Sequence, residues 1–375
     1  MTAIGSWSVE FDSSRLVFGL DSIDRLGQLT ADLGCRNVLL VSDPGVRAAG
    51  HVERAAAALG GRSIAAEVFD RVEENPSTQH VEDGVRVASQ RGVDGIVAVG
   101  GGSALDCAKG INFLLTNGGK MQDYRGVNRA SRPMLPSVGV PTTAGTGSDA
   151  QSFALISDES TKAKMACGDR KAKFRVVVLD PQLSITAPRT VTAMAGMDAI
   201  SHAVESYVCN KRNPLSVLLA REAWRLLERN LETVLASSGD TEARGAMLLG
   251  SHLAGAAIEH SMLGAAHACA NPLTARFGVT HSAAVNLMLP HVMRYNEQDV
   301  GELYDELSGG SAGALRARVV ELRGIAGMPT TLRDCSIAQD GLVELAQDAS
   351  RQWTADFNPR PVDAEKLLEL YEAAY

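Results

Sequence analysis

One aspartate and three histidines in the second half of the chain constrain its chemistry more than any other feature. Asp198 and His202 stand four positions apart in a small and apolar segment of helical period, so they share one helix face. His267 and His281 follow, with thirteen residues between them. One carboxylate and three imidazoles form a complete ligand set for a divalent metal such as iron(II) or zinc. Taken singly, each has an ordinary alternative, a solvated Asp–His pair or a hydrogen-bonded core histidine.

A glycine-rich turn in the first half is the second informative feature. The β-branched run 96–99 ends in glycines that include Gly101 and Gly102, and Ser103 then opens a helical pattern. Glycines let a backbone approach a ligand closely, and a helix N-terminus offers free N–H groups to a phosphate. The spacing is not GxGxxG, so the turn alone fits a phosphate site and an ordinary tight turn equally well.

A polar loop with two glycines comes next, directly after the strand-like run 136–140. Its hydroxyl-bearing residues include Thr142, Thr143 and Ser148. These hydroxyls would suit a pyrophosphate and a nicotinamide ribose. A Ser/Thr-rich surface loop is the alternative for this segment on its own.

An acidic residue ends the first apolar strand pattern. Asp43 follows the run 37–42, where a carboxylate can accept both hydroxyls of an adenosine ribose. The same carboxylate would repel a 2′-phosphate, which favours NAD over NADP. A turn aspartate before Pro44 explains the position equally well.

Together these segments resemble the iron-containing (group III) alcohol dehydrogenases along nearly the whole chain. The motifs that carry the resemblance are Gly-Gly-Gly-Ser103, Pro141-Thr-Thr-Ala-Gly-Thr-Gly-Ser148, Leu179-Asp-Pro181, Gly196-Met-Asp-Ala-Ile-Ser-His202, Leu289-Pro-His-Val-Met-Arg-Tyr-Asn296 and Asn358-Pro-Arg-Pro-Val362. Their order and specificity leave no room for chance.

The resemblance implies a site residue by residue. The metal ligands, for Fe²⁺ ahead of Zn²⁺, fall on Asp198, His202, His267 and His281. The NAD contacts fall on Asp43, Gly101, Gly102, Ser103, Asp106, Thr142, Thr143, Ser148 and Lys164. The residues expected at the chemistry itself are His267, His281 and Asn271.

The chain departs from its relatives at two places. Many members carry a second histidine four residues after the third ligand, where this chain has Asn271, an amide that cannot act as acid or base near neutral pH. The proton route is then expected to use water or cofactor hydroxyls. Asp149 and Gln151 replace a commoner glutamate and β-branched residues, which favours a more polar substrate pocket.

Composition excludes several classes of protein. The 375 residues include 36 basic and 44 acidic side chains, so no basic surface indicates nucleic acid or an anionic membrane as a partner. Six cysteines without CxxC spacing indicate reduced thiols in a cytoplasmic protein. The N-terminal segment has no signal-peptide pattern, and no apolar run reaches the ~20 residues that span a membrane.

The pattern of secondary structure divides the chain near residue 183. Residues 1–183 predict an α/β dinucleotide-binding domain, doubly wound with a mostly parallel, Rossmann-like sheet, and residues 184–375 an all-helical metal-binding and catalytic domain. The expected strands are 37–42, 63–68, 95–99, 137–140 and 176–179. The expected helices include 47–59, 80–90, 214–231, 242–270, 312–325 and 364–374.

The function expected from these features is metal-dependent hydride transfer between NAD(H) and a small alcohol or aldehyde. The metal would act as a Lewis acid on the substrate oxygen. The resemblance also implies a homodimer. Alternatives are a lyase resembling dehydroquinate synthase, which shares the fold and uses NAD with zinc, a catalytically silent member, and glycerol-dehydrogenase-like or maleylacetate-reductase-like enzymes.

Overall fold

The computed structural model describes residues 6–161 and 163–375. Residues 1–5, part of the segment in which no signal-peptide pattern was found, lie outside the described residues, as does Lys162. The chain forms two compact units. The first takes the chain up to Ala187 together with Gly239–Leu248, and the second takes Pro188–Ser238 and Leu249–Tyr375.

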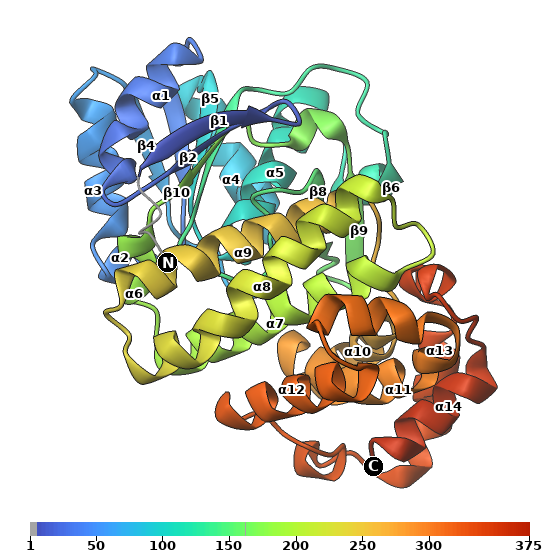
Figure 1. Ribbon diagram of the computed structural model, residues 1–375. Coiled ribbons are helices and arrows are strands. Elements are labelled where there is room, and N and C mark those ends of the chain that lie inside the picture. The colour runs from blue at the N-terminus through green and yellow to red at the C-terminus, as the bar shows by residue number, and fades with distance from the viewer. Residues whose placement is uncertain (1–5, 162) are drawn as a thin grey trace. The chain divides into compact units, whose positions relative to one another are not determined.

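The first unit is built on a seven-stranded sheet of order β1-β2-β10-β7-β5-β3-β4. Figure 1 labels several of these strands, β1 and β2 among them. Every neighbouring pair is parallel except β1 and β2, which are antiparallel. The strands are β1 (Trp7–Phe11), β2 (Ser14–Phe18), β3 (Asn37–Val41), β4 (Ala65–Phe69), β5 (Gly95–Gly100), β7 (Ser137–Pro141) and β10 (Val176–Leu179). The predicted α/β class and all five predicted strands are confirmed, β4 lying slightly later than expected.

Helices bury both faces of this sheet. On one face, residues such as Leu40, Val97 and Val178 join an apolar cluster with α1 (Leu26–Asp32) and α3 (His51–Gly60). Side chains alternate along a strand, so the intervening residues point to the opposite face. The helices α4 (Thr78–Arg91) and α5 (Gly102–Asn117) pack on these strands as well. Burial on both faces explains why the central strands are almost continuously apolar.

Several elements of the first unit carried no signal in the sequence pattern. They are β1, β2 and a separate three-stranded sheet of β6 (Gly126–Val127), β9 (Lys164–Gly168) and β8 (Phe153–Ser157). The helix expected at 47–59 is instead two helices, α2 (Pro44–Ala48) and α3. Gly50 separates them with φ +82°, a left-handed conformation that glycine adopts without steric cost.

The second unit is helical, and the part of it that the structure describes contains no strand. Its helices are α7 (Arg189–Val208), α8 (Pro214–Ala236), α10 (Ala265–Phe277), α11 (His281–Ser308), α12 (Ala312–Ile325), α13 (Leu342–Ala349) and α14 (Ala364–Ala373). The buried α7 packs on α8 and α11, and α10 packs on α11 and α13. Asn213 and Asp363 cap α8 and α14, because each side chain accepts first-turn N–H groups of its helix.

The prediction of a single helix over 242–270 is wrong. The structure has α9 (Thr241–Glu259), a short non-helical segment, and then α10. Gly264 directly precedes α10 with non-helical backbone angles, φ −127° and ψ −146°. A Cβ at Gly264 would lie 2.9 Å from Oδ1 of Asn358 and 3.0 Å from Oε1 of Glu205. The close approach of these two side chains explains why glycine occupies this position, while the alanine-rich pattern continues on both sides of the break.

None of the helices that the structure describes combines the length and the apolarity needed to cross a membrane.

Candidate functional site

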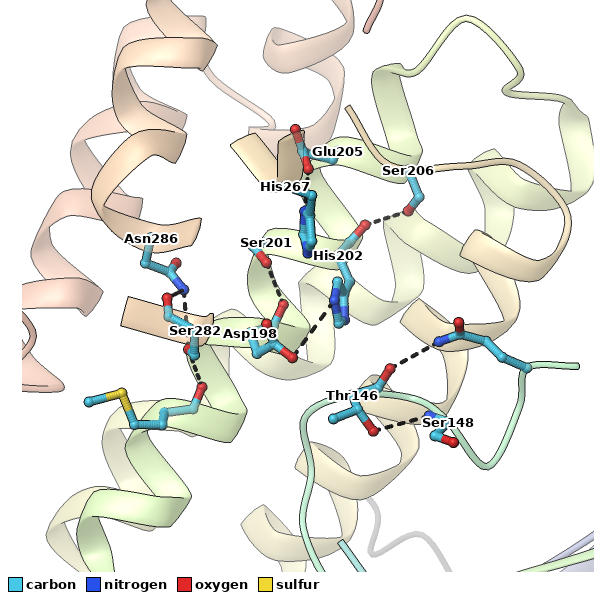
Figure 2. A network of polar contacts seen from close by, with 12 residues as sticks. Thr146, Ser148, Asp198, Ser201, His202, Glu205, Ser206, His267, Ser282 and Asn286 are labelled. Carbon is cyan, nitrogen blue, oxygen red and sulfur yellow. Dashed lines mark hydrogen bonds and ion pairs between the residues drawn. The ribbon is translucent and has the colours of Figure 1, made fainter. Parts of the chain in front are cut away.

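The first half of the candidate metal centre lies on α7. Asp198 and His202 are one turn apart on this helix, and each is only 5% exposed. Nε2 of His202 lies 3.7 Å from Oδ2 of Asp198 (Figure 2). The helical spacing seen in the sequence therefore brings both side chains to the same buried place.

Two other helices complete the cluster. His267 lies in the first turn of α10, and His281 is the first residue of α11. One potential ligand atom from each of Asp198, His267 and His281 lies within 4.8 Å of the others. The ring of His202 stacks on that of His267 at a centroid distance of 5.0 Å. The ring of His281 also contacts that of His267, at a centroid distance of 5.4 Å. The structure thus gathers all four residues expected from the sequence.

The chemistry of this cluster fits a divalent metal. Nε2 of His267 is buried and has no hydrogen-bond partner among the residues described. Buried polar atoms almost always have a partner, so a lone imidazole nitrogen facing other donor atoms calls for an ion or a water. Carboxylate and imidazole donors together are typical of iron(II) and zinc sites.

A glutamate that the sequence analysis did not assign belongs to the same cluster. Oε2 of Glu205 lies 2.5 Å from Nδ1 of His267 (Figure 2). Its Oε1 accepts the N–H of Ala266 at 2.8 Å. Glu205 is 4% exposed and follows His202 by three residues on α7. An acidic residue on the ligand face of a buried helix was the signal that could have found it.

Asn271 lies one turn beyond His267 on α10 and is half-buried. Its Nδ2 donates a hydrogen bond to Oε1 of Gln352 at 3.1 Å. This bond sets which way the amide points. Nothing in the sequence indicated Gln352, which lies eighty-one positions further along the chain.

In the first unit, the two polar glycine loops pack against each other. Gly101 is the N-cap of α5 and makes no side-chain cap hydrogen bond. A Cβ on Gly102 would lie 2.5 Å from the side chain of Thr146, and one on Gly101 would lie 3.3 Å from Oγ1 of Thr143. The first turn of α5 has no acidic residue and includes the partly exposed Ser103. Its N–H groups are therefore suited to an anionic ligand.

Asp43 lies beside these loops. Its Oδ1 caps α2 by accepting the N–H of Val46 at 2.9 Å. Its Oδ2 is 3.2 Å from the position that a Cβ on Gly100 would take. Asp43 is thus both the turn aspartate before Pro44 and a carboxylate at the end of β3 next to the glycine turn.

Asp106, Lys109 and Ser148 form a buried polar cluster under the second loop. Nζ of Lys109 donates to the backbone oxygen of Ser148 at 2.6 Å, to its Oγ at 2.9 Å and to the oxygen of Phe153 at 2.7 Å. Ser148 in turn donates to Asp106. Burial raises the pKa of Asp106, and the charge of Lys109 opposes that rise.

The remaining expected cofactor residues are placed as follows. Thr142 is buried and donates its backbone N–H to the oxygen of Gly100 at 3.0 Å, which ties the second loop to the end of β5. Lys164 is exposed at the start of β9, and its Nζ lies 3.4 Å from Oδ1 of Asn75. Burial raises the pKa of Asp106, and the charge of Lys164 partly offsets that rise. The charge of Lys164 thus acts on Asp106, which lies under the second loop.

Comparison with known proteins identifies the family. Residues 13–181 match the model described as "Iron-containing alcohol dehydrogenase", and residues 192–375 match "Fe-containing alcohol dehydrogenase family, C-terminal". Alcohol dehydrogenase 4 of Schizosaccharomyces pombe is 38% identical over 71% of this chain and 63% of its own length. The 1,3-propanediol dehydrogenase of Citrobacter freundii is 34% identical over 96% of both chains. The crystal structure of a 1,3-propanediol oxidoreductase superposes with a TM-score of 0.92 at 33% identity, covering 96% of this chain and 97% of that one.

The chain belongs to the iron-containing alcohol dehydrogenase family. It is accordingly a metal-dependent oxidoreductase of alcohols or aldehydes that uses NAD and a divalent metal ion. The resemblance drawn from the sequence is confirmed. The lyase and the two other oxidoreductase alternatives are not favoured.

Proposed function

We propose that Asp198, His202, His267 and His281 hold the divalent metal, and that the chain interconverts a small alcohol and its aldehyde with NAD(H). The convergence of one buried carboxylate and three imidazoles from α7, α10 and α11 carries this proposal. When bound there, the metal supplies a Lewis acid for the substrate oxygen, and NAD supplies the hydride acceptor.

The chain's own residues would bind and orient these groups. The free N–H groups at the start of α5 would hold the pyrophosphate, with Gly101 and Gly102 allowing its close approach. Thr142, Thr143 and Ser103 would contribute around it, with Lys164 at the loop edge. Asp106 and Ser148 are held by Lys109, so they would brace the loop around the cofactor.

The experiment that tests the proposal is a panel of small alcohols and aldehydes run with NAD or NADH after loading with iron(II) or zinc. Turnover of at least one small substrate, dependent on the added metal, is the expected result. Its chain length and polarity would name the substrate, and the better metal would distinguish iron from zinc. Absence of metal-dependent turnover across the panel would contradict the proposal.

Asp43 should set the choice of cofactor. Its carboxylate lies beside the glycine turn and would repel a 2′-phosphate, an effect of about 1–3 kcal/mol if partly desolvated. Asp43→Gly should therefore weaken the binding of NAD and allow NADP to bind. The ratio of kcat/KM with NAD to kcat/KM with NADP should fall. Asp43→Gly also removes the side chain that caps α2. Asp43→Asn is therefore the matched variant, since it keeps an acceptor oxygen for the cap and reports the loss of the charge alone. Equal kinetics with NAD and NADP in the unaltered protein would contradict this assignment.

Asn271 should act in substrate binding rather than in proton transfer. The amide lies on the same helix face as His267 and cannot exchange a proton near neutral pH. Asn271→Ala should mainly raise KM, and Asn271→His should add an ionisation near pH ~6–7 to the kcat profile. Gln352→Ala should reproduce a weaker form of the KM effect, since it frees the amide of Asn271 to turn. Unchanged kcat and KM in Asn271→Ala would place the side chain outside the site.

Assembly and location are also part of the proposal. Cys35, Cys107, Cys167, Cys209, Cys269 and Cys335 are all free thiols in the structure, and all but Cys335 are buried. Unpaired buried thiols fit a reducing compartment, so we propose a cytoplasmic enzyme. The family resemblance supports a homodimer, which sedimentation of the purified protein would test.

A further inference from the structure

Glu205 makes two contacts in the cluster, one to a histidine ring and one to the backbone beside it. Its Oε2 lies 2.5 Å from Nδ1 of His267, and its Oε1 accepts the N–H of Ala266 at 2.8 Å. The side chain is 4% exposed, so solvent does not compete for these oxygens. Both carboxylate oxygens of a residue on α7 are therefore committed to the first turn of α10.

The direction of each hydrogen bond follows from the donor inventory. An ionised carboxylate can only accept, so Nδ1 of His267 must carry the proton. In a neutral imidazole the other nitrogen then has the lone pair. That nitrogen, Nε2, is the buried atom with no hydrogen-bond partner among the residues described. The contact with Glu205 thus leaves Nε2 in the only form that can bind a metal.

We propose that Glu205 is a positioning residue that selects the metal-binding tautomer of His267 and so sets the metal affinity of the site. This inference rests on the proposed function, since it takes His267 as a ligand. Carboxylates that hold the second nitrogen of a ligating histidine fix both ring orientation and tautomer, and changing them costs about 10–100-fold in metal affinity.

Capping of α10 is a second role of the Glu205 side chain. Different carboxylate oxygens serve the cap and the contact with His267. Asn358 caps the neighbouring position, because its Oδ1 accepts the N–H of Ala265 at 3.2 Å. Oε1 of Glu205 caps Ala266 in the same way, whereas Oε2 reaches the ring of His267 instead. A residue needed only as a cap requires one acceptor oxygen. Glu205 uses two.

The discriminating substitution is Glu205→Gln, which keeps size and one acceptor oxygen. If the glutamine oxygen caps Ala266, its NH₂ group faces Nδ1 of His267, which must then accept. The proton moves to Nε2, and the ring can no longer bind a metal through that atom. The cap, and with it the metal-free fold, is retained.

The first test needs no substitution. With nitrogen-15 in the histidine rings, two-bond proton–nitrogen correlation spectra of the metal-free protein should show His267 as the Nδ1–H tautomer, with assignment by His267→Gln. In Glu205→Gln the same resonances should change to the Nε2–H tautomer. An Nε2–H tautomer in the unaltered protein would overturn the proposal.

The second test measures zinc affinity by competition with a chromophoric chelator. The Kd of Glu205→Gln should rise about 10–100-fold, with a metal-free Tm close to that of the unaltered protein. Asn358→Ala is the matched control, since it removes a cap of α10 without touching His267. It should lower the Tm and leave the zinc Kd within about twofold.

The outcomes separate this proposal from the one on which it rests. Unaltered protein that binds no zinc would contradict the proposed metal site. Unaltered protein that binds zinc, together with an unchanged Kd in Glu205→Gln, would overturn the role of Glu205 alone. A fall in Tm without a change in Kd would likewise reduce Glu205 to a helix cap.

Discussion

Replacement of Asp198 by alanine should abolish bound metal and turnover together while the protein stays folded. Asp198 supplies the carboxylate that shares the cluster with His267 and His281. Loss of an outer partner of a metal ligand already costs about 10–100-fold in affinity or activity, so loss of a ligand should cost more than about 100-fold. His281→Ala should behave in the same way. Metal content by elemental analysis and kcat under saturating NADH measure the two effects.

The matched control for Asp198→Ala is Ser201→Ala on the same helix. Ser201 is fully buried, and its Oγ donates to the backbone oxygen of Asp198 at 2.6 Å (Figure 2). Its removal should leave metal content and turnover close to those of the unaltered protein. Full metal occupancy and activity in both Asp198→Ala and His281→Ala would refute the ligand assignment.

The second large effect concerns stability of the first unit. Lys109→Met should lower its free energy of unfolding by about 3–5 kcal/mol, because it leaves buried acceptors without their charged donor. The side chain is 1% exposed, and its Nζ bonds three oxygens of Ser148 and Phe153 while lying 3.6 Å from Asp106. Native-state hydrogen exchange of amides in β5 and β7 reports this unit specifically.

Arg86→Met provides the comparison, since Arg86 lies on α4 in the same unit and is 62% exposed, with its partner Asp83 30% exposed. Surface substitutions of this kind change stability by less than about 0.5 kcal/mol. Similar losses in the two variants would mean that the buried cluster under the second loop contributes no more than a surface pair.

Two of the four cluster residues could be placed together because their pattern is local, whereas His267 and His281 were expected there from the family resemblance. Asp198 and His202 are related by one helical turn, which the sequence displays directly. The sheet of the first unit was also readable, since parallel strands buried on both faces are continuous apolar runs. The sequence alone could not show where Asp43 lies relative to the glycine turn, because a helix cap and a cofactor contact have the same local sequence.

The features that the sequence did not reveal depend on contacts between distant segments. Glu205 meets His267 across sixty-two positions of the chain, and Asn271 meets Gln352 across eighty-one. The glycine directly before α10 is explained by the approach of Asn358 and Glu205, which leave no room for a Cβ at Gly264. Neither periodicity nor local propensity contains such information, so only the folded structure shows the contact between His267 and Glu205.

The most direct test of the central claim is an anaerobic titration of chelator-stripped, metal-free protein with iron(II). NADH-dependent reduction of a small aldehyde is followed as the metal is added. We expect negligible reduction at the start, a linear rise that ends at one ion per chain, and no rise in Asp198→Ala. Undiminished reduction by the metal-free protein, or an equal response in Asp198→Ala, would contradict it.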